Sequence, residues 1–248
     1  MGSEPLADRG RPSYVWRSGQ ARRMALMGDW ARVEGAWLLD VGCGVGLYTR
    51  QLAQAGARAV GTEIELPRAM QARSSDLRVV AAPAERLPFP DATFDTVLLH
   101  EVLEHVADDG QALREVARVL VDGGRALVFV PNRWWPFETH GLYWRGRYRF
   151  GNAPLVNYLP DAARNVLAPH VRVYTGSGLR KLVLGLPFQV IHHTRLFPGF
   201  DRVIATRPRL GRALRASCHV LERTPARVMG LSHLLVLQRQ ARGDRLDR

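Results

Sequence analysis

The 248-residue chain is poor in lysine and cysteine, and it has no long apolar run. Lys181 is the only lysine among 35 Lys and Arg residues, and Cys43 and Cys218 are the only cysteines. Two isolated cysteines without metal-ligand spacing argue against a disulfide framework and against a zinc site. No segment reaches the ~18 apolar residues of a membrane-spanning helix, and the first residues lack the basic-then-apolar order of a signal peptide. These absences predict a cytoplasmic protein without a structural metal.

Acidic residues are scarce in one half of the chain. Residues 1–131 contain 15 Lys and Arg and 17 Asp and Glu residues, whereas residues 132–248 contain 20 and 6. Such asymmetry predicts that the second half binds an anionic partner. The candidate partners are nucleic acid, an anionic membrane surface and an acidic substrate. A general preference for arginine is the alternative explanation, although it does not account for acids that are missing from one half only.

A glycine-rich loop is the most informative feature of the sequence. Residues 37–41 predict a buried strand, residues 46–55 predict a helix, and the glycines 42, 44 and 46 lie between them. Glycines let a backbone adopt positive φ and approach a ligand closely. The helix that follows offers free N–H groups at its N-terminus. The arrangement predicts a nucleotide-binding crevice.

The remaining pattern predicts an α/β fold. Residues 58–63 predict a second strand that ends in the Glu63 carboxylate, ~20 residues after the glycines, the spacing of an acid that accepts ribose hydroxyls. Further strands are expected near residues 77–81, 94–99, 125–130, 188–195 and 233–238, and helices near 14–31, 66–73, 108–120, 177–184 and 209–223. Alternating strands and helices form a parallel sheet, which binds ligands beyond its C-terminal strand ends.

Four segments, in this order, resemble the successive motifs of class I S-adenosylmethionine-dependent methyltransferases, especially the small-molecule and quinone-precursor subgroup. They are residues 39–46 (LDVGCGVG), 60–64 (VGTEI), 84–97 (AERLPFPDATFDTV) and 100–106 (HEVLEHV). The resemblance covers about residues 36–131. It implies a Rossmann-like, doubly wound, mostly parallel seven-stranded sheet with helices on both faces and a substrate-covering insertion. NAD-binding Rossmann proteins lack the third and fourth segments.

The resemblance also implies roles in binding S-adenosylmethionine. The implied residues are Asp40 for the methionine amino group, Gly42, Gly44 and Gly46 for the floor beneath methionine and ribose, Glu63 for the ribose, Ile64 and Ala84 for the adenine, and His100 at the methionine end. One position departs from the family pattern. Pro83 stands where an acid usually contacts the adenine amino group, so this contact falls to the Ala84 backbone or to Glu85. In related methyltransferases an arginine of this N-terminal helix can meet the methionine carboxylate, and Arg17 and Arg22 are the candidates, with a solvated arginine as the alternative.

We expect four segments along the chain. They are an N-terminal arm and helix (1–35), the cofactor-binding core (36–131), an aromatic and basic insertion over the substrate mouth (132–170), and a C-terminal completion of the sheet with a basic helical insertion (171–248). The aromatic residues of the first insertion, among them Trp134 and Trp144, either line an acceptor pocket or pack the insertion onto the core. The basic segment 209–223 either lies on an anionic membrane or packs on the domain.

Methyl transfer from a sulfonium needs an oriented acceptor and, for a hydroxyl or acidic carbon, a general base. His100 and His140 are the candidate bases, whereas His105 lies in an apolar segment and is predicted to be structural. We predict a methyltransferase that acts on a small or lipid-like acceptor, with no metal ion and peripheral to an anionic membrane. The alternatives are an RNA methyltransferase and a non-catalytic S-adenosylmethionine-binding module. Nucleic acid is less favoured because no recognised RNA-binding motif accompanies the charge.

Overall fold

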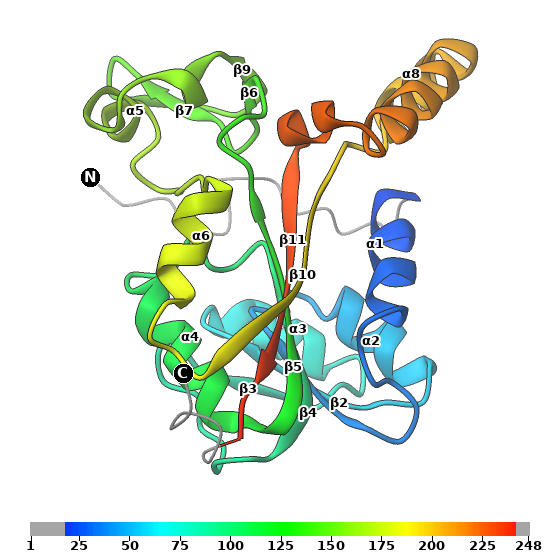
Figure 1. The fold of residues 1–248 in the computed structure, drawn as a ribbon, viewed down its shortest axis with the longest axis vertical. Helices are drawn as coiled ribbons and strands as arrows, with labels where there is room; N and C mark the ends of the chain where they lie inside the picture. The colour runs from blue at the N-terminus through cyan, green and yellow to red at the C-terminus, as the bar shows by residue number, and fades with distance from the viewer. Residues whose placement is uncertain (1–17, 242–248) are drawn as a thin grey trace.

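The computed structural model describes residues 18–241 and contains a seven-stranded sheet with helices on both faces (Figure 1). Its strands are β1 (Trp37–Val41), β2 (Arg58–Glu63), β3 (Val79–Ala81), β4 (Phe94–His100), β5 (Leu120–Pro131), β10 (Phe188–Leu196) and β11 (Ser232–Arg239). The helices around it are α1 (Ser18–Gly28), α2 (Leu47–Gln54), α3 (Leu66–Arg73), α4 (Asp109–Val119) and α6 (Gly176–Val183).

The strand order is β10-β11-β5-β4-β1-β2-β3. β1 pairs in parallel with both β2 and β4, and β11 is antiparallel to its neighbours β5 and β10. The predicted mostly parallel, seven-stranded sheet is therefore confirmed. The chain moves outward from β1 to β3 and then returns to β4 on the other side of β1. Such a reversal opens a crevice at the C-terminal ends of the two strands.

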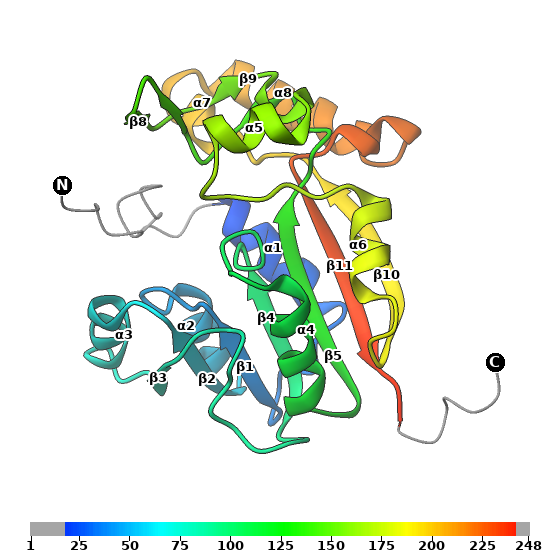
Figure 2. The same ribbon diagram turned by 90° about the vertical axis from the view of Figure 1, so that its left-hand side faces the viewer.

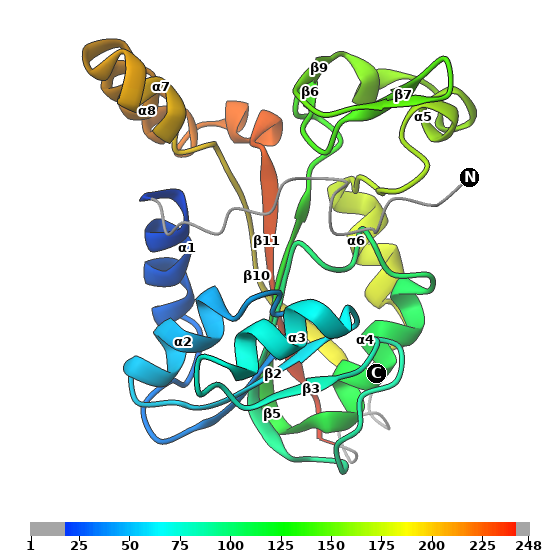
Figure 3. The same cartoon turned by 180° about the vertical axis from the view of Figure 1, so that it is seen from behind.

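Both faces of the sheet are buried, which explains the continuous apolar runs in the strands. Leu39 and Leu99 pack in one cluster with side chains of α4 and α6. Leu38 and Leu98 point to the opposite face and pack with side chains of α1 and α2. Figure 2 shows α4 and α6 in front of the sheet, and Figure 3 shows α1 and α2 on its other side. The alternation of adjacent residues between two layers holds the strand ends in a fixed position.

Two insertions extend beyond the C-terminal ends of the parallel strands (Figures 1 and 2). The first contains β6 (Phe137–Glu138), β7 (Leu142–Trp144), β8 (Arg147–Arg149), β9 (Ala153–Pro154), η2 (Val156–Tyr158) and α5 (Asp161–Leu167). The second contains α7 (Asp201–Thr206), α8 (Pro208–Leu221) and η3 (Pro225–Met229). Both insertions therefore lie at the end of the sheet where the glycine-rich loop is found.

Candidate functional site

The glycine-rich loop joins β1 to α2 in a conformation that needs glycine. Gly42, Gly44 and Gly46 have φ values of +67°, +57° and +82°, in the region that side chains disfavour. A Cβ on Gly42 would lie 2.6 Å from Val102, and one on Gly46 would lie 2.2 Å from Leu77. A Cβ on Gly44 would meet no atom within 4 Å. The outer two glycines thus permit packing, whereas Gly44 presents an open backbone face to a ligand.

Asp40 lies at the end of β1 with a buried side chain. Its Oδ2 accepts a hydrogen bond of 2.6 Å from the Thr49 hydroxyl. Burial raises the pKa of Asp40 to about 7, the nearby Glu63 carboxylate adds to the rise, and the Thr49 hydrogen bond opposes it. A buried carboxylate that is held by a neutral hydroxyl gains most from a cationic ligand. The site therefore fits the ammonium group of methionine.

Glu63 lies at the end of β2 with its carboxylate against the glycine-rich loop. One oxygen accepts a hydrogen bond from the Gly44 N–H at 2.8 Å, and the other accepts one from the Glu65 N–H at 2.9 Å. Each carboxylate oxygen has a second lone pair, so the side chain can still accept hydroxyl donors. Ile64 follows with a side chain that is 65% exposed. This pair matches the combination of a ribose acceptor and an apolar adenine contact.

The loop after β3 carries Ala84 and Glu85, the two alternatives for the contact with the adenine edge. The Glu85 carboxylate accepts a hydrogen bond of 2.7 Å from the Ala107 N–H, and the Glu85 carbonyl accepts one from Gln111. Glu85 therefore holds the start of α4 in place. The Ala84 side chain is buried, so only its backbone can offer a contact. The geometry favours the backbone of Ala84 over Glu85.

His100 lies at the end of β4, but its surroundings do not suit a general base. Its Nε2 is 2.7 Å from Arg23 Nη1 and 3.2 Å from the Tyr48 hydroxyl. Burial and the charge of Arg23 lower the pKa of His100 to about 3. A general base needs a lone pair that can reach the acceptor, and the lone pair on His100 Nε2 already accepts a hydrogen bond from Arg23. The geometry favours a positioning role for His100.

Arg23 is a site residue that the sequence analysis did not single out. Its guanidinium contacts His100 and forms an ion pair of 3.1 Å with Glu101. Burial raises the pKa of Glu101, but the charge of Arg23 and the neighbouring His100 and His140 together outweigh burial and lower that pKa to about 2. Arg22 instead pairs with Glu222 beyond α8, and Arg17 lies outside the described residues. Of the arginines in α1, Arg23 is the one that reaches the end of β4.

His140, the second candidate base, comes from the first insertion. Its Nδ1 and its backbone N–H lie 3.1 Å and 2.9 Å from one oxygen of the buried Glu138. The other oxygen of Glu138 accepts a 2.5 Å hydrogen bond from buried Arg164. His140 Nε2 lies 3.9 Å from Glu101 Oε2. The insertion thus places His140 beside the end of β4, with its Nε2 facing the site.

The three tryptophans of the first insertion divide into two groups. Trp134 and Trp144 are 48% and 49% exposed. Trp135 packs against Phe137 and Phe197, with ring centroids 5.9 Å and 6.1 Å apart. Packing therefore explains Trp135, but it does not explain the exposed rings of Trp134 and Trp144.

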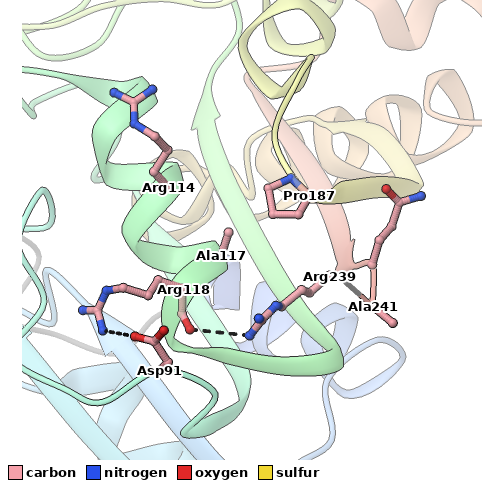
Figure 4. Close-up of a pocket in the computed structure, with 8 residues that line it drawn as sticks. Asp91, Arg114, Ala117, Arg118, Pro187, Arg239 and Ala241 are labelled. Carbon is pink, nitrogen blue, oxygen red and sulfur yellow. Dashed lines mark hydrogen bonds and ion pairs between the residues drawn. The ribbon is translucent and has the colours of Figure 1, made fainter. Parts of the chain in front are cut away.

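A separate hollow lies at the opposite end of the sheet (Figure 4). It is lined by Arg118, Arg239 and Pro187, and Arg118 pairs there with Asp91 at 3.0 Å. These residues surround the N-terminal ends of the parallel strands, whereas open α/β sheets bind ligands at the C-terminal ends. We therefore assign the functional site to the glycine-rich end.

Comparisons with known proteins agree with this geometry. Residues 39–128 match the family described as "Methyltransferase domain". The demethylmenaquinone methyltransferase of Corynebacterium urealyticum is 32% identical over 114 residues, which are 46% of this chain and 47% of that protein. An uncharacterized methyltransferase of Mycobacterium leprae is 36% identical over 144 residues, 53% of this chain and 52% of its own. The chain thus spans about half the length of these curated relatives.

Solved structures share the fold at low sequence identity. An S-adenosylmethionine-dependent methyltransferase from Mesorhizobium loti aligns with a TM-score of 0.64 and 20% identity over 90% of this chain and 99% of its own. The [4+2]-cyclase SpnF aligns with a TM-score of 0.61 and 18% identity, covering 92% and 84%. The fold alone therefore does not define the reaction. The ordered motifs and the match over residues 39–128 together show a methyltransferase domain in that part of the chain, and the seven-stranded sheet has the fold of the solved S-adenosylmethionine-dependent methyltransferase.

Proposed function

We propose that this protein transfers the methyl group of S-adenosylmethionine to a small, lipid-like acceptor. The observation that carries the proposal is the convergence of three features at the reversal point between β1 and β4. They are the open backbone face at Gly44, the buried Asp40 carboxylate and the loop-bound Glu63 carboxylate. This convergence offers a cation acceptor, a hydroxyl acceptor and an unobstructed floor between them.

The cofactor, when bound, supplies an electrophilic methyl group on a sulfonium. The chain's own residues hold and orient it. Asp40 accepts the methionine ammonium, Glu63 accepts ribose hydroxyls, and Ile64 covers one adenine face. Gly42, Gly44 and Gly46 form the floor, the Ala84 backbone meets the adenine edge, and His100 with Arg23 shapes the methionine end. These roles are proposals that follow from position and chemistry.

Three observations support a lipid-like acceptor near an anionic surface. The curated relative from Corynebacterium urealyticum is named for demethylmenaquinone. Trp134 and Trp144 offer exposed rings at the end of the sheet that holds the site. Exposed Leu210 and Leu214 lie on α8 among the basic residues Arg209, Arg212 and Arg215. Within residues 18–241, no helix combines the length and apolar character needed to cross a bilayer. The exposed leucines and the arginines of α8 support a surface contact through this helix.

Calorimetry with S-adenosylmethionine tests the cofactor site. Glu63→Ala should weaken binding by about 1–3 kcal/mol, as expected when hydrogen bonds to a charged group are lost. Glu34→Ala is the matched control, because Glu34 is an exposed glutamate before β1. Unchanged affinity in a folded Glu63→Ala protein would remove the ribose assignment. Binding of NAD in place of S-adenosylmethionine would contradict the assignment of S-adenosylmethionine as the cofactor.

Acceptor class is tested with radiolabelled cofactor and fractionated cell extract. Label should enter the lipid fraction, and this incorporation should require the wild-type site. Label in the RNA fraction, together with tight salt-dependent RNA binding, would make the basic half an RNA-binding surface. Tight cofactor binding without label in any fraction would favour a non-catalytic binding module.

Membrane contact is tested by vesicle co-sedimentation. Each exposed basic residue contributes about 1 kcal/mol near an anionic surface, and the attraction fades within a Debye length. Binding should rise with anionic lipid content and fall with salt. Replacing Leu210 and Leu214 by Ser should weaken it without changing cofactor affinity. Equal sedimentation with neutral and anionic vesicles would contradict the proposed surface.

A further inference from the structure

A buried carboxylate that has a second carboxylate as its neighbour lies beside the proposed cofactor site. Glu104, in the turn that follows β4, is 1% exposed. Among residues 18–241, neither of its carboxylate oxygens receives a hydrogen bond. A buried carboxylate is unfavourable unless a cation or a proton compensates it.

The cationic side chains near this turn are engaged elsewhere. Arg23 pairs with Glu101 at 3.1 Å, and Arg164 pairs with Glu138 at 2.5 Å. Within the described part of the chain, Glu104 has no ion-pair partner. The backbone of Glu101 adopts a left-handed φ of +58°, which is uncommon for a residue with a side chain. The turn thus brings two carboxylates together and compensates one of them.

Two histidines lie near Glu104, and a hydrogen bond at Nδ1 of each ring fixes which ring nitrogen carries the lone pair. Ligand atoms of Glu104, His105 and His140 all lie within 4.8 Å of one another. His105 Nδ1 is 3.2 Å from the His170 carbonyl oxygen, and His140 Nδ1 is 3.1 Å from Glu138 Oε1. A ring nitrogen beside such an acceptor carries the hydrogen, so each neutral ring keeps its lone pair on Nε2. Metal-binding histidines are oriented by this same kind of contact.

We propose that Glu104, His105 and His140 bind a divalent metal ion, with Glu101 as an additional oxygen ligand. Glu101 Oε2 lies 3.9 Å from His140 Nε2, so it is close enough to the other three side chains to share a metal ion with them. Two imidazoles with carboxylates favour a first-row transition ion such as Mn²⁺, Co²⁺ or Zn²⁺ over Ca²⁺. The inference replaces the sequence prediction of no metal, and it changes His105 from structural to ligand and His140 from base to ligand.

The position of this cluster points to an acceptor with a hydroxyl group, an extension that rests on the proposed function. The ligands follow β4 directly, next to His100 at the methionine end, and His140 comes from the insertion above it. A hydroxyl oxygen bound to the ion becomes more acidic and releases its proton to solvent. The oxygen lone pair then forms a bond to the methyl carbon while the carbon–sulfur bond breaks toward sulfur. The products are a methyl ether and S-adenosylhomocysteine, and no histidine base is required.

Metal binding is tested on the full chain, untagged and pretreated with EDTA. Equilibrium dialysis with Mn²⁺, Co²⁺, Zn²⁺ and Mg²⁺ should give about one transition ion per chain and weaker retention of Mg²⁺. Bound Co²⁺ should develop visible absorption from nitrogen and oxygen ligands. Glu104→Gln and His140→Asn each remove a ligand, so each should weaken binding by more than the roughly 10–100-fold that the loss of an outer-shell contact costs. Glu34→Gln and His192→Asn are the matched controls, because both residues lie outside the cluster.

The opposing explanation is a proton shared between Glu101 and Glu104. In that case the wild-type protein retains no ion at neutral pH, its melting temperature is unmoved by Mn²⁺, and the proposal is wrong. If Glu104→Gln fails to fold by circular dichroism, His105→Asn provides the second test, because His105 is exposed. Cofactor calorimetry in EDTA separates the two proposals. Intact cofactor binding without metal retention overturns only the metal site, whereas metal retention without cofactor binding overturns only the proposed function.

Discussion

The pH dependence of cofactor binding should report on Asp40. Its pKa rises from 3.8 to about 7 because the side chain is buried, which corresponds to roughly 4 kcal/mol against ionisation. The methionine ammonium requires the ionised form. Below pH 7, binding must therefore release the Asp40 proton, and the affinity should rise about tenfold per pH unit. Above pH 7 the affinity should level off, and Asp40→Asn should bind weakly with a flat profile.

Calorimetry from pH 5.5 to pH 8.5, in buffers of different ionisation enthalpy, measures both the affinity and the proton released. Thr49→Ala is the informative companion variant, because the Thr49 hydroxyl stabilises the charged form of Asp40. Its loss should move the bend of the profile to higher pH. A flat profile for the wild-type protein would refute the assignment of Asp40 to the ammonium group. So would a steep profile that persists in Asp40→Asn.

The same pKa makes a prediction for the stability of the protein without cofactor. Between pH 3.8 and about 7 the folded protein holds the Asp40 proton more tightly than the unfolded chain does. The contribution of Asp40 to the free energy of unfolding therefore falls as pH rises through this window. The full decline is roughly 4 kcal/mol. Urea denaturation at several pH values should show that this component of the pH dependence disappears in Asp40→Asn.

Three further predictions concern packing and the acceptor site. Arg164→Met removes the ion-pair partner of the buried Glu138 carboxylate and should cost about 3–5 kcal/mol in urea denaturation. Arg133→Met breaks a pair with the exposed Asp161 and should cost under about 1 kcal/mol. Equal losses would contradict the role of burial. Replacing Trp134 and Trp144 by Ala should lower turnover at limiting acceptor without changing cofactor affinity, and normal turnover would make these rings structural only. Gly44→Ala should lose cofactor affinity and about 1–2 kcal/mol of stability from its positive φ, a result checked by calorimetry and thermal melting.

Most of the sheet was predictable from the sequence because strand and helix periodicity are local. Residues 37–41, 58–63 and 66–73 form the elements that their patterns predict. β5 begins earlier than expected, at Leu120, because Leu120 pairs with Phe94 before a register shift in the ladder. The predicted segment 209–223 lies largely in α8, which begins at Pro208. Such boundaries depend on pairing between distant strands, which periodicity does not record.

The sequence by itself determined the glycine-rich loop, the strand-end acids Asp40 and Glu63, and the order of the motifs, because each depends on residues close together in the chain. The tertiary structure alone decided how the side chains at the end of β4 pair with one another. Arg23 comes from α1, and His140 comes from an insertion that follows β5, yet both lie beside the turn that carries Glu101 and Glu104. Contacts between residues that are far apart in the sequence decide which carboxylate has a cationic partner and which histidine keeps a free lone pair. No local pattern carries that information, because it arises only when the packed sheet fixes where each strand ends.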